Sequence, residues 1–119
     1  MRWRGRLFCV ASQYDTLCLM TDYDVAVFKF QSVCRVAVVL GVAEDFLGMD
    51  ELLDRIQKRD SQAGILLEQF FNAYDQWFPL SKLDALGGEQ FTELMQKMEV
   101  RDTTRNHLIQ YLAGLQRQR

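Results

Sequence analysis

The sequence predicts a mainly helical protein, a single domain built as a small helical bundle of about five helices with a short β-hairpin or extended N-terminal segment. The 119 residues are too few for two separate cores, so residues 1–119 are expected to form one domain. The composition, 49% hydrophobic and 25% charged, is that of a globular chain. Apolar residues recur at helical spacing through residues 22–117, the predicted helical core.

Residues 1–21 are predicted to be a β or extended appendage, because residues 3–11 and 16–21 have the length and apolarity of two short strands. If both also pair with residues 25–30, the fold becomes α+β, the alternative. The apolar run at residues 7–11 is shorter than the roughly 7–15 residues of a signal-peptide core. No run approaches the roughly 20 residues that span a membrane. We therefore expect a cytoplasmic protein that makes no membrane contact.

Residues 22–40 are rich in valine, which favours a strand, but their pattern favours a helix. Asp22 and Asp24 suit a helix N-terminus, and Gly41 suits the C-terminal end. A strand over residues 25–30 stays open. The apolar side of the helical wheel, expected to face inward, holds Ala26, Val27, Phe30, Val33, Cys34, Ala37, Val38 and Leu40.

The next segments continue the helical pattern. One helix, or two broken at Gly48, is expected between residues 42 and 59. Residues 61–78 have the clearest amphipathic pattern and are predicted to form the central helix. Pro79 lacks a backbone donor and restricts the residue before it, so this helix is predicted to stop at Phe78. The side chains expected to face inward between residues 42 and 59 are Phe46, Met49, Leu52, Leu53 and Ile56.

Residues 81–86 are predicted to form a turn, and Gly87 and Gly88 to open a helix with Phe91, Leu94, Met95 and Met98 on its apolar side. A second turn is expected at residues 99–102. Asp102 or Thr103 can cap the last helix. It is predicted to bury Leu108, Ile109, Tyr111, Leu112 and Leu115.

Residues 90–117 therefore resemble a helix-turn-helix unit, which gives DNA-binding transcriptional regulation as the alternative function. Hydrogen-bond donors at the start of its second helix would contact phosphates or base edges. The chain as a whole carries a formal charge of −2, which disfavours binding to polyanions. The candidate DNA-binding residues are Arg101, Thr103, Thr104, Arg105 and Asn106.

No catalytic residue, metal site or cofactor is predicted. Cys9, Cys18 and Cys34 are widely spaced among apolar neighbours, which is typical of buried thiols. His107, the only histidine, is expected on the polar side of the last helix. The acidic residues at 44–45 and 50–54 are interpreted as solvated helix faces, since their spacing does not match a calcium loop.

The leading hypothesis is a small non-enzymatic regulatory or adaptor protein that acts by protein–protein interaction. Most of the aromatic stripe on residues 61–78 is expected to be core. Eight phenylalanines, two tryptophans and five methionines are nevertheless many large apolar groups for a domain of this size. Such residues are enriched at interface centres, so a partner protein or a homodimer is favoured. The predicted partner-binding residues are Phe71, Tyr74, Trp77 and Phe78.

Overall fold

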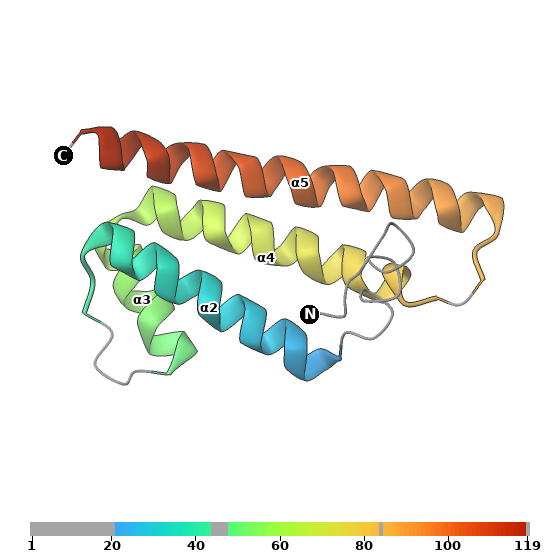
Figure 1. The fold of residues 1–119 in the computed structure, drawn as a ribbon, viewed down its shortest axis with the longest axis horizontal. Coiled ribbons are helices and arrows are strands. Elements are labelled where there is room, and N and C mark those ends of the chain that lie inside the picture. Colours follow the sequence, from blue (N-terminus) through green and yellow to red (C-terminus); the bar gives the residue numbers. More distant parts are fainter. Residues whose placement is uncertain (1–20, 44–47, 84, 119) are drawn as a thin grey trace, which may run out of the picture.

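The computed structural model describes residues 21–43, 48–83 and 85–118. These residues form a helical bundle of four helices and contain no strand (Figure 1). The helices are α2 (Asp22–Leu40), α3 (Met49–Arg59), α4 (Ser61–Ser81) and α5 (Gly88–Arg117). The mainly helical class is therefore confirmed. The predicted strands at 3–11 and 16–21 lie outside the described residues, apart from Thr21.

Helix α2 has the predicted bounds, and its ends follow from local chemistry. The Thr21 hydroxyl accepts a hydrogen bond from the Asp24 N–H at 3.2 Å, and the Asp24 carboxylate accepts one from the Thr21 N–H at 2.9 Å. This reciprocal cap satisfies two backbone donors. Gly41 ends the helix at φ +71°, a conformation that favours glycine. Residues 25–30 are helical, so the strand alternative is wrong.

The buried face of α2 differs from the predicted one. Phe30 and Val38, expected inside, are 41% and 68% exposed, and Ala26 is also exposed. Lys29 lies toward the inside, where its Nζ forms a hydrogen bond and an ion pair with Asp75 of α4. The Asp75 carboxylate gives this cation a partner between α2 and α4. The buried residues of α2 are Val25, Val33, Val36, Ala37 and Leu40.

Helix α3 is short and meets α4 at a sharp corner. It begins after Gly48, as the break predicted there implies, and buries Leu52 and Ile56. Asp60 lies between the two helices. Its N–H bonds to the Ile56 carbonyl, and its carboxylate accepts from the Gln62 and Ala63 N–H groups at the start of α4.

Helix α4 is the central helix, as predicted, but it extends past Pro79 to Ser81. The prediction that it stops at Phe78 is wrong because Pro79 falls in the last turn, where its missing donor costs a single helical bond. The Ser81 hydroxyl and the Lys82 N–H bond to the carbonyls of Phe78 and Pro79, which completes the end of the helix. Phe78 is itself buried and packs in the core.

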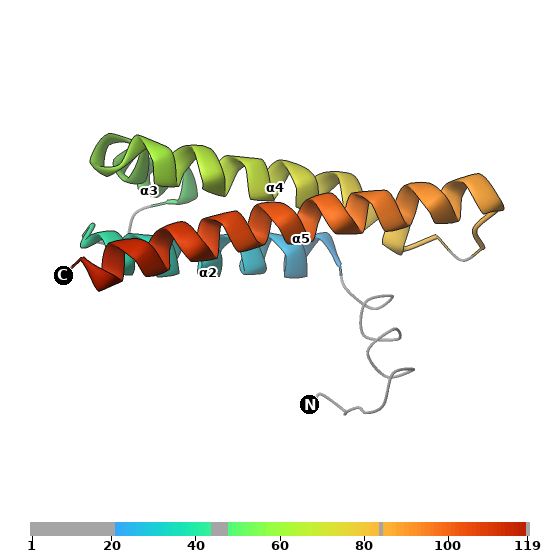
Figure 2. The same ribbon diagram turned by 90° about the horizontal axis from the view of Figure 1, so that it is seen from above.

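Helices α4 and α5 form a long hairpin, the most extensive contact between described helices (Figure 1). Leu94, Arg101, Leu108 and Leu115 of α5 recur every seven residues and are buried or half-buried. Seen from above, α5 lies over the space between α4 and α2, and α2 contacts it only sparsely (Figure 2). One side of α5 is therefore packed along the hairpin, and much of its remaining surface has no partner within the described chain.

Candidate interaction surface

The predicted partner-binding residues are core residues. Phe71, Tyr74 and Phe78 are each 7% exposed, and Trp77 is 2% exposed. They belong to the same cluster as the buried aliphatic residues of α2, α3 and α4. These aromatic side chains therefore cannot act as anchors for a partner unless the bundle opens.

The rings pack against one another at the centre of the bundle. Phe28 of α2 stacks on Tyr74 with centroids 5.0 Å apart, and Tyr74 meets Trp77 edge-on at 5.2 Å. The Arg101 guanidinium of α5 lies 4.1 Å from the centre of the Trp77 ring, a cation–π contact. Burial raises the pKa of the Tyr74 hydroxyl, and the neighbouring Arg101 cation partly opposes that rise. Because the cluster connects α2, α4 and α5, its main role is to stabilise the bundle.

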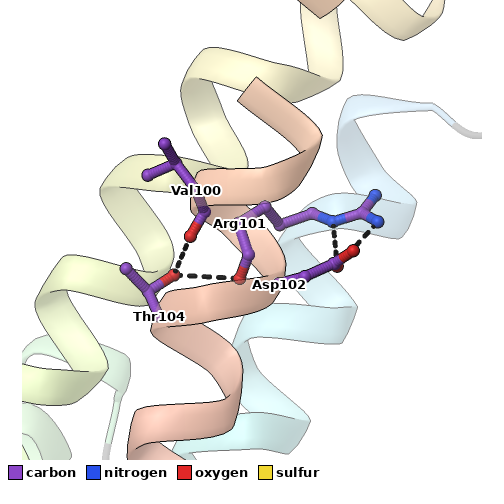
Figure 3. Close-up of polar contacts among 4 residues, drawn as sticks. All are labelled: Val100, Arg101, Asp102 and Thr104. Carbon is purple, nitrogen blue, oxygen red and sulfur yellow. Dashed lines mark hydrogen bonds and ion pairs between the residues drawn. The ribbon is translucent and has the colours of Figure 1, made fainter. Parts of the chain in front are cut away.

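The predicted helix-turn-helix unit is absent, because residues 88–117 form one continuous helix. Figure 3 shows why residues 99–102 do not turn. The Thr104 hydroxyl bonds back to the Val100 and Arg101 carbonyls at 3.0 and 2.9 Å, as a threonine inside a helix does. Asp102 does not cap a new helix, since its Oδ1 accepts hydrogen bonds from the Arg101 guanidinium at 2.8 and 3.0 Å.

The candidate DNA-binding residues are consequently spread around α5. Thr103, Arg105 and Asn106 are exposed, whereas Thr104 is half-buried and Arg101 lies over the Trp77 ring. A recognition helix requires a preceding helix that crosses the DNA backbone and a turn between the two. The described residues provide neither at this position.

The exposed apolar side chains of α5 form a different candidate surface. Phe91, Met95 and Ile109 are 55%, 48% and 46% exposed, although all three were predicted to face the core. With 3.6 residues per turn, they lie on one side of α5, beside the residues that face α4. We name this row the α5 stripe, made up of Phe91, Met95, Met98, Asp102, Arg105 and Ile109.

Several other exposed apolar side chains lie on α2, on α4 and on the opposite side of α5. Tyr23, Phe30 and Val38 lie on α2, and Ile65 lies on α4. Val100 of α5 is 51% exposed, but it is nine residues from both Phe91 and Ile109, which places it on the opposite side of the helix. The α5 stripe thus places three exposed apolar groups, Phe91, Met95 and Ile109, on one side of a single helix.

Groups able to support catalysis or bind a metal do not converge among the described residues. His107 is exposed on α5, as predicted, and Cys34 is half-buried in α2. Asp50 and Asp54 line a shallow groove between α3 and α4 together with Glu68. No described group of three or more histidine, cysteine or acidic residues is arranged to hold a metal. Cys9, Cys18 and the acidic pair at 44–45 lie outside the described residues.

None of the helices described combines the length and apolarity needed to cross a membrane. Comparisons of the chain with protein-family models, curated proteins and solved structures gave no match.

The sequence contained a signal for the α5 stripe. If residues 88–117 are treated as one helix, the apolar residues fall into two adjacent rows, each with a seven-residue repeat. One row holds Leu94, Leu108 and Leu115 and faces the bundle. The other begins with Phe91 and Met98 and forms the α5 stripe. Placing a turn at residues 99–102 breaks both rows, which is why Phe91 and Met95 were predicted to be core residues.

Proposed function

We propose that this chain is a small cytoplasmic, non-enzymatic regulatory or adaptor protein that acts by binding another protein chain through the α5 stripe. The observation that carries the proposal is the exposure of Phe91, Met95 and Ile109 in one row on a helix whose other side is packed in the bundle. Large apolar and methionine side chains are enriched at the centres of protein interfaces. Binding would remove this apolar row from water.

The charged residues in the row support a specific contact. Asp102 and Arg105 interrupt the apolar side chains near the middle of α5, and the Asp102 side chain is 56% exposed. Opposite charges at the centre of an interface fix its register and reject wrong partners more than they add affinity. A purely apolar row would lack that selectivity.

DNA recognition is not favoured, because it depended on a turn at residues 99–102 that interrupts α5. The formal charge of −2 likewise provides no general attraction for a polyanion. Protein binding is still favoured, but the proposed contact surface lies on α5 and not at the residues of α4 predicted from the sequence.

The test is affinity capture from the native cell extract with tagged wild type, Met95→Glu and Val100→Glu. Both substitutions put a carboxylate at a half-exposed apolar position of α5, but only Met95 lies in the α5 stripe. We expect the wild type and Val100→Glu to retain a protein chain, an untagged copy included, that Met95→Glu loses. Equal retention by all three proteins, or a wild type that retains no chain, would contradict the proposal.

Trp77→Ala is unsuitable for this test because Trp77 is 2% exposed. Removing a buried tryptophan typically costs about 3–5 kcal/mol of folding free energy. Loss of binding by that variant would follow from unfolding alone. Circular dichroism and urea unfolding of Met95→Glu and Val100→Glu should instead match the wild type to within about 0.5 kcal/mol, as expected for exposed positions.

A further inference from the structure

The part of the α5 stripe from Met95 onward, continued to Leu112, matches itself when reversed about the midpoint of positions 103 and 104, whereas Phe91 falls opposite Gln116 and lies outside the match. Its members recur at alternating intervals of four and three residues, the spacing of a coiled-coil seam. Moving outward from the midpoint, the matched positions are Asp102 with Arg105, Met98 with Ile109, and Met95 with Leu112. An acid is thus matched with a base, and the exposed Met95 and Ile109 are matched with Leu112 and Met98, which are half-buried against the core of their own chain.

We propose that the partner on the α5 stripe is a second copy of this chain, with the two α5 helices packed antiparallel about a two-fold axis. This inference rests on the proposed function and names its partner. In a two-fold dimer the same surface is used by both copies, so every contact occurs twice. Asp102 of each copy then faces Arg105 of the other, and Met98 of each faces Ile109 of the other.

Charge selects the antiparallel orientation. In a parallel pair each position faces its own copy, so Asp102 would face Asp102 and Arg105 would face Arg105. Like charges directly opposite one another at a helix seam repel, whereas the antiparallel pair replaces both repulsions by attractions. Arg105 is exposed, and the Asp102 side chain is 56% exposed although its Oδ1 already accepts hydrogen bonds from Arg101 of its own chain, so the proposed contact adds Arg105 of the second copy to that pair.

The exposure of Phe91, Met95 and Ile109 shows that this side of α5 is not covered by the described helices. Leu94 and Leu108 face the hairpin, and the α5 stripe lies beside them. Figure 3 shows Asp102 pointing away from α4, toward the side on which α2 lies. From Phe91 to Leu112 the row spans three heptads, about 32 Å at 1.5 Å per residue. That is most of the molecule's long dimension of 45 Å.

The first test is analytical ultracentrifugation of the full chain over a wide concentration range. We expect the wild type and Val100→Glu to form dimers with the same dissociation constant. Met95→Glu and Ile109→Glu should each raise that constant at least 100-fold, because each substitution occurs twice in a two-fold interface. A wild type that stays monomeric, or a dimer that Met95→Glu and Ile109→Glu leave intact, would overturn the inference.

The second test exchanges charges between chains. Asp102→Lys places four cations at the centre of the dimer, and Arg105→Glu places four anions there, so each variant alone should dimerise at least tenfold more weakly than the wild type. Mixed in equal amounts, they should form a heterodimer close to wild-type affinity, because every charge then meets its opposite. A mixture no tighter than either single variant would contradict the proposed pairing.

The third test measures orientation with spin labels on Asn106→Cys and on Glu89→Cys, in a chain whose Cys9, Cys18 and Cys34 are replaced by alanine. In an antiparallel dimer the axial offset between the two labels is about 8 Å at position 106 and about 44 Å at position 89. A parallel dimer would give similar short distances at both positions and would overturn the antiparallel arrangement.

Failure of the dimer is distinguishable from failure of the proposed function. If the wild type is monomeric but Met95→Glu still loses a different captured protein, the self-pairing inference falls and the proposed function stands. If neither self-association nor capture depends on Met95, both fall.

Discussion

Gly64 shows how one residue sets the distance between two helices. A Cβ atom at this position would lie 2.4 Å from Cγ and 3.3 Å from Cα of Gln57, so α3 approaches α4 over a bare backbone. Alanine would push the helices apart. We predict that Gly64→Ala lowers the free energy of unfolding by about 1–3 kcal/mol, measured by urea denaturation.

Gly114 of α5 provides the matched control. A Cβ there meets nothing closer than the Arg117 guanidinium at 3.8 Å, an ordinary contact. Gly114→Ala should therefore raise the free energy of unfolding by about 0.5–1 kcal/mol, through helix propensity alone. If Gly64→Ala were equally stabilising, the close approach of α3 and α4 would be wrong.

Tyr74 and Tyr111 make stability sensitive to alkaline pH. The Tyr111 hydroxyl donates to the Asp60 carboxylate, and this bond raises the pKa of Tyr111 above 10.0; burial does the same for Tyr74. A pKa raised by folding gives stability that is present in full below pH 10 and lost as pH rises through the folded value. We expect the unfolding free energy to fall as the pH rises above about 10, and to fall less in Tyr111→Phe. An identical slope in that variant would contradict the assignment.

At the scale of elements, the continuity of α5 is the feature to test. Val100 is 51% exposed in the middle of the helix, where few contacts obscure backbone effects. Val100→Gly should be about 1 kcal/mol less stable than Val100→Ala, because glycine is a poor residue inside a helix. Circular dichroism and urea unfolding of the two variants measure this difference. Equal stability would indicate a turn at this position.

Periodicity and end signals predicted most helices well, and failed where tertiary contacts decide. The bounds of α2 followed from its polar pattern, Asp24 and Gly41, and its rotation did not, because only Asp75 on another helix explains the inward Lys29. A turn was predicted at residues 99–102 because aspartate and threonine often cap helices. In α5 the Asp102 carboxylate instead pairs with a neighbouring arginine.

At the scale of the molecule, the sequence indicated an excess of large apolar residues but not their location. Helix α4 is apolar around much of its circumference because α2, α3 and α5 pack around it. Its aromatic side chains are therefore buried in the core. Helix α5 is packed along one side only, so several of its large apolar side chains are exposed on the other sides. Only the packing order of the helices distinguishes the two cases, and that order is not a local property of the sequence.

Asp60 lies at a point where three helices meet. It ends α3, starts α4, and accepts the Tyr111 hydroxyl near the far end of α5 at 2.7 and 2.8 Å. The corner and the last turns of the chain therefore depend on each other, although 51 positions separate them. During synthesis Asp60 leaves the ribosome 51 positions before Tyr111, so this joint is expected to close only once that part of α5 has also emerged.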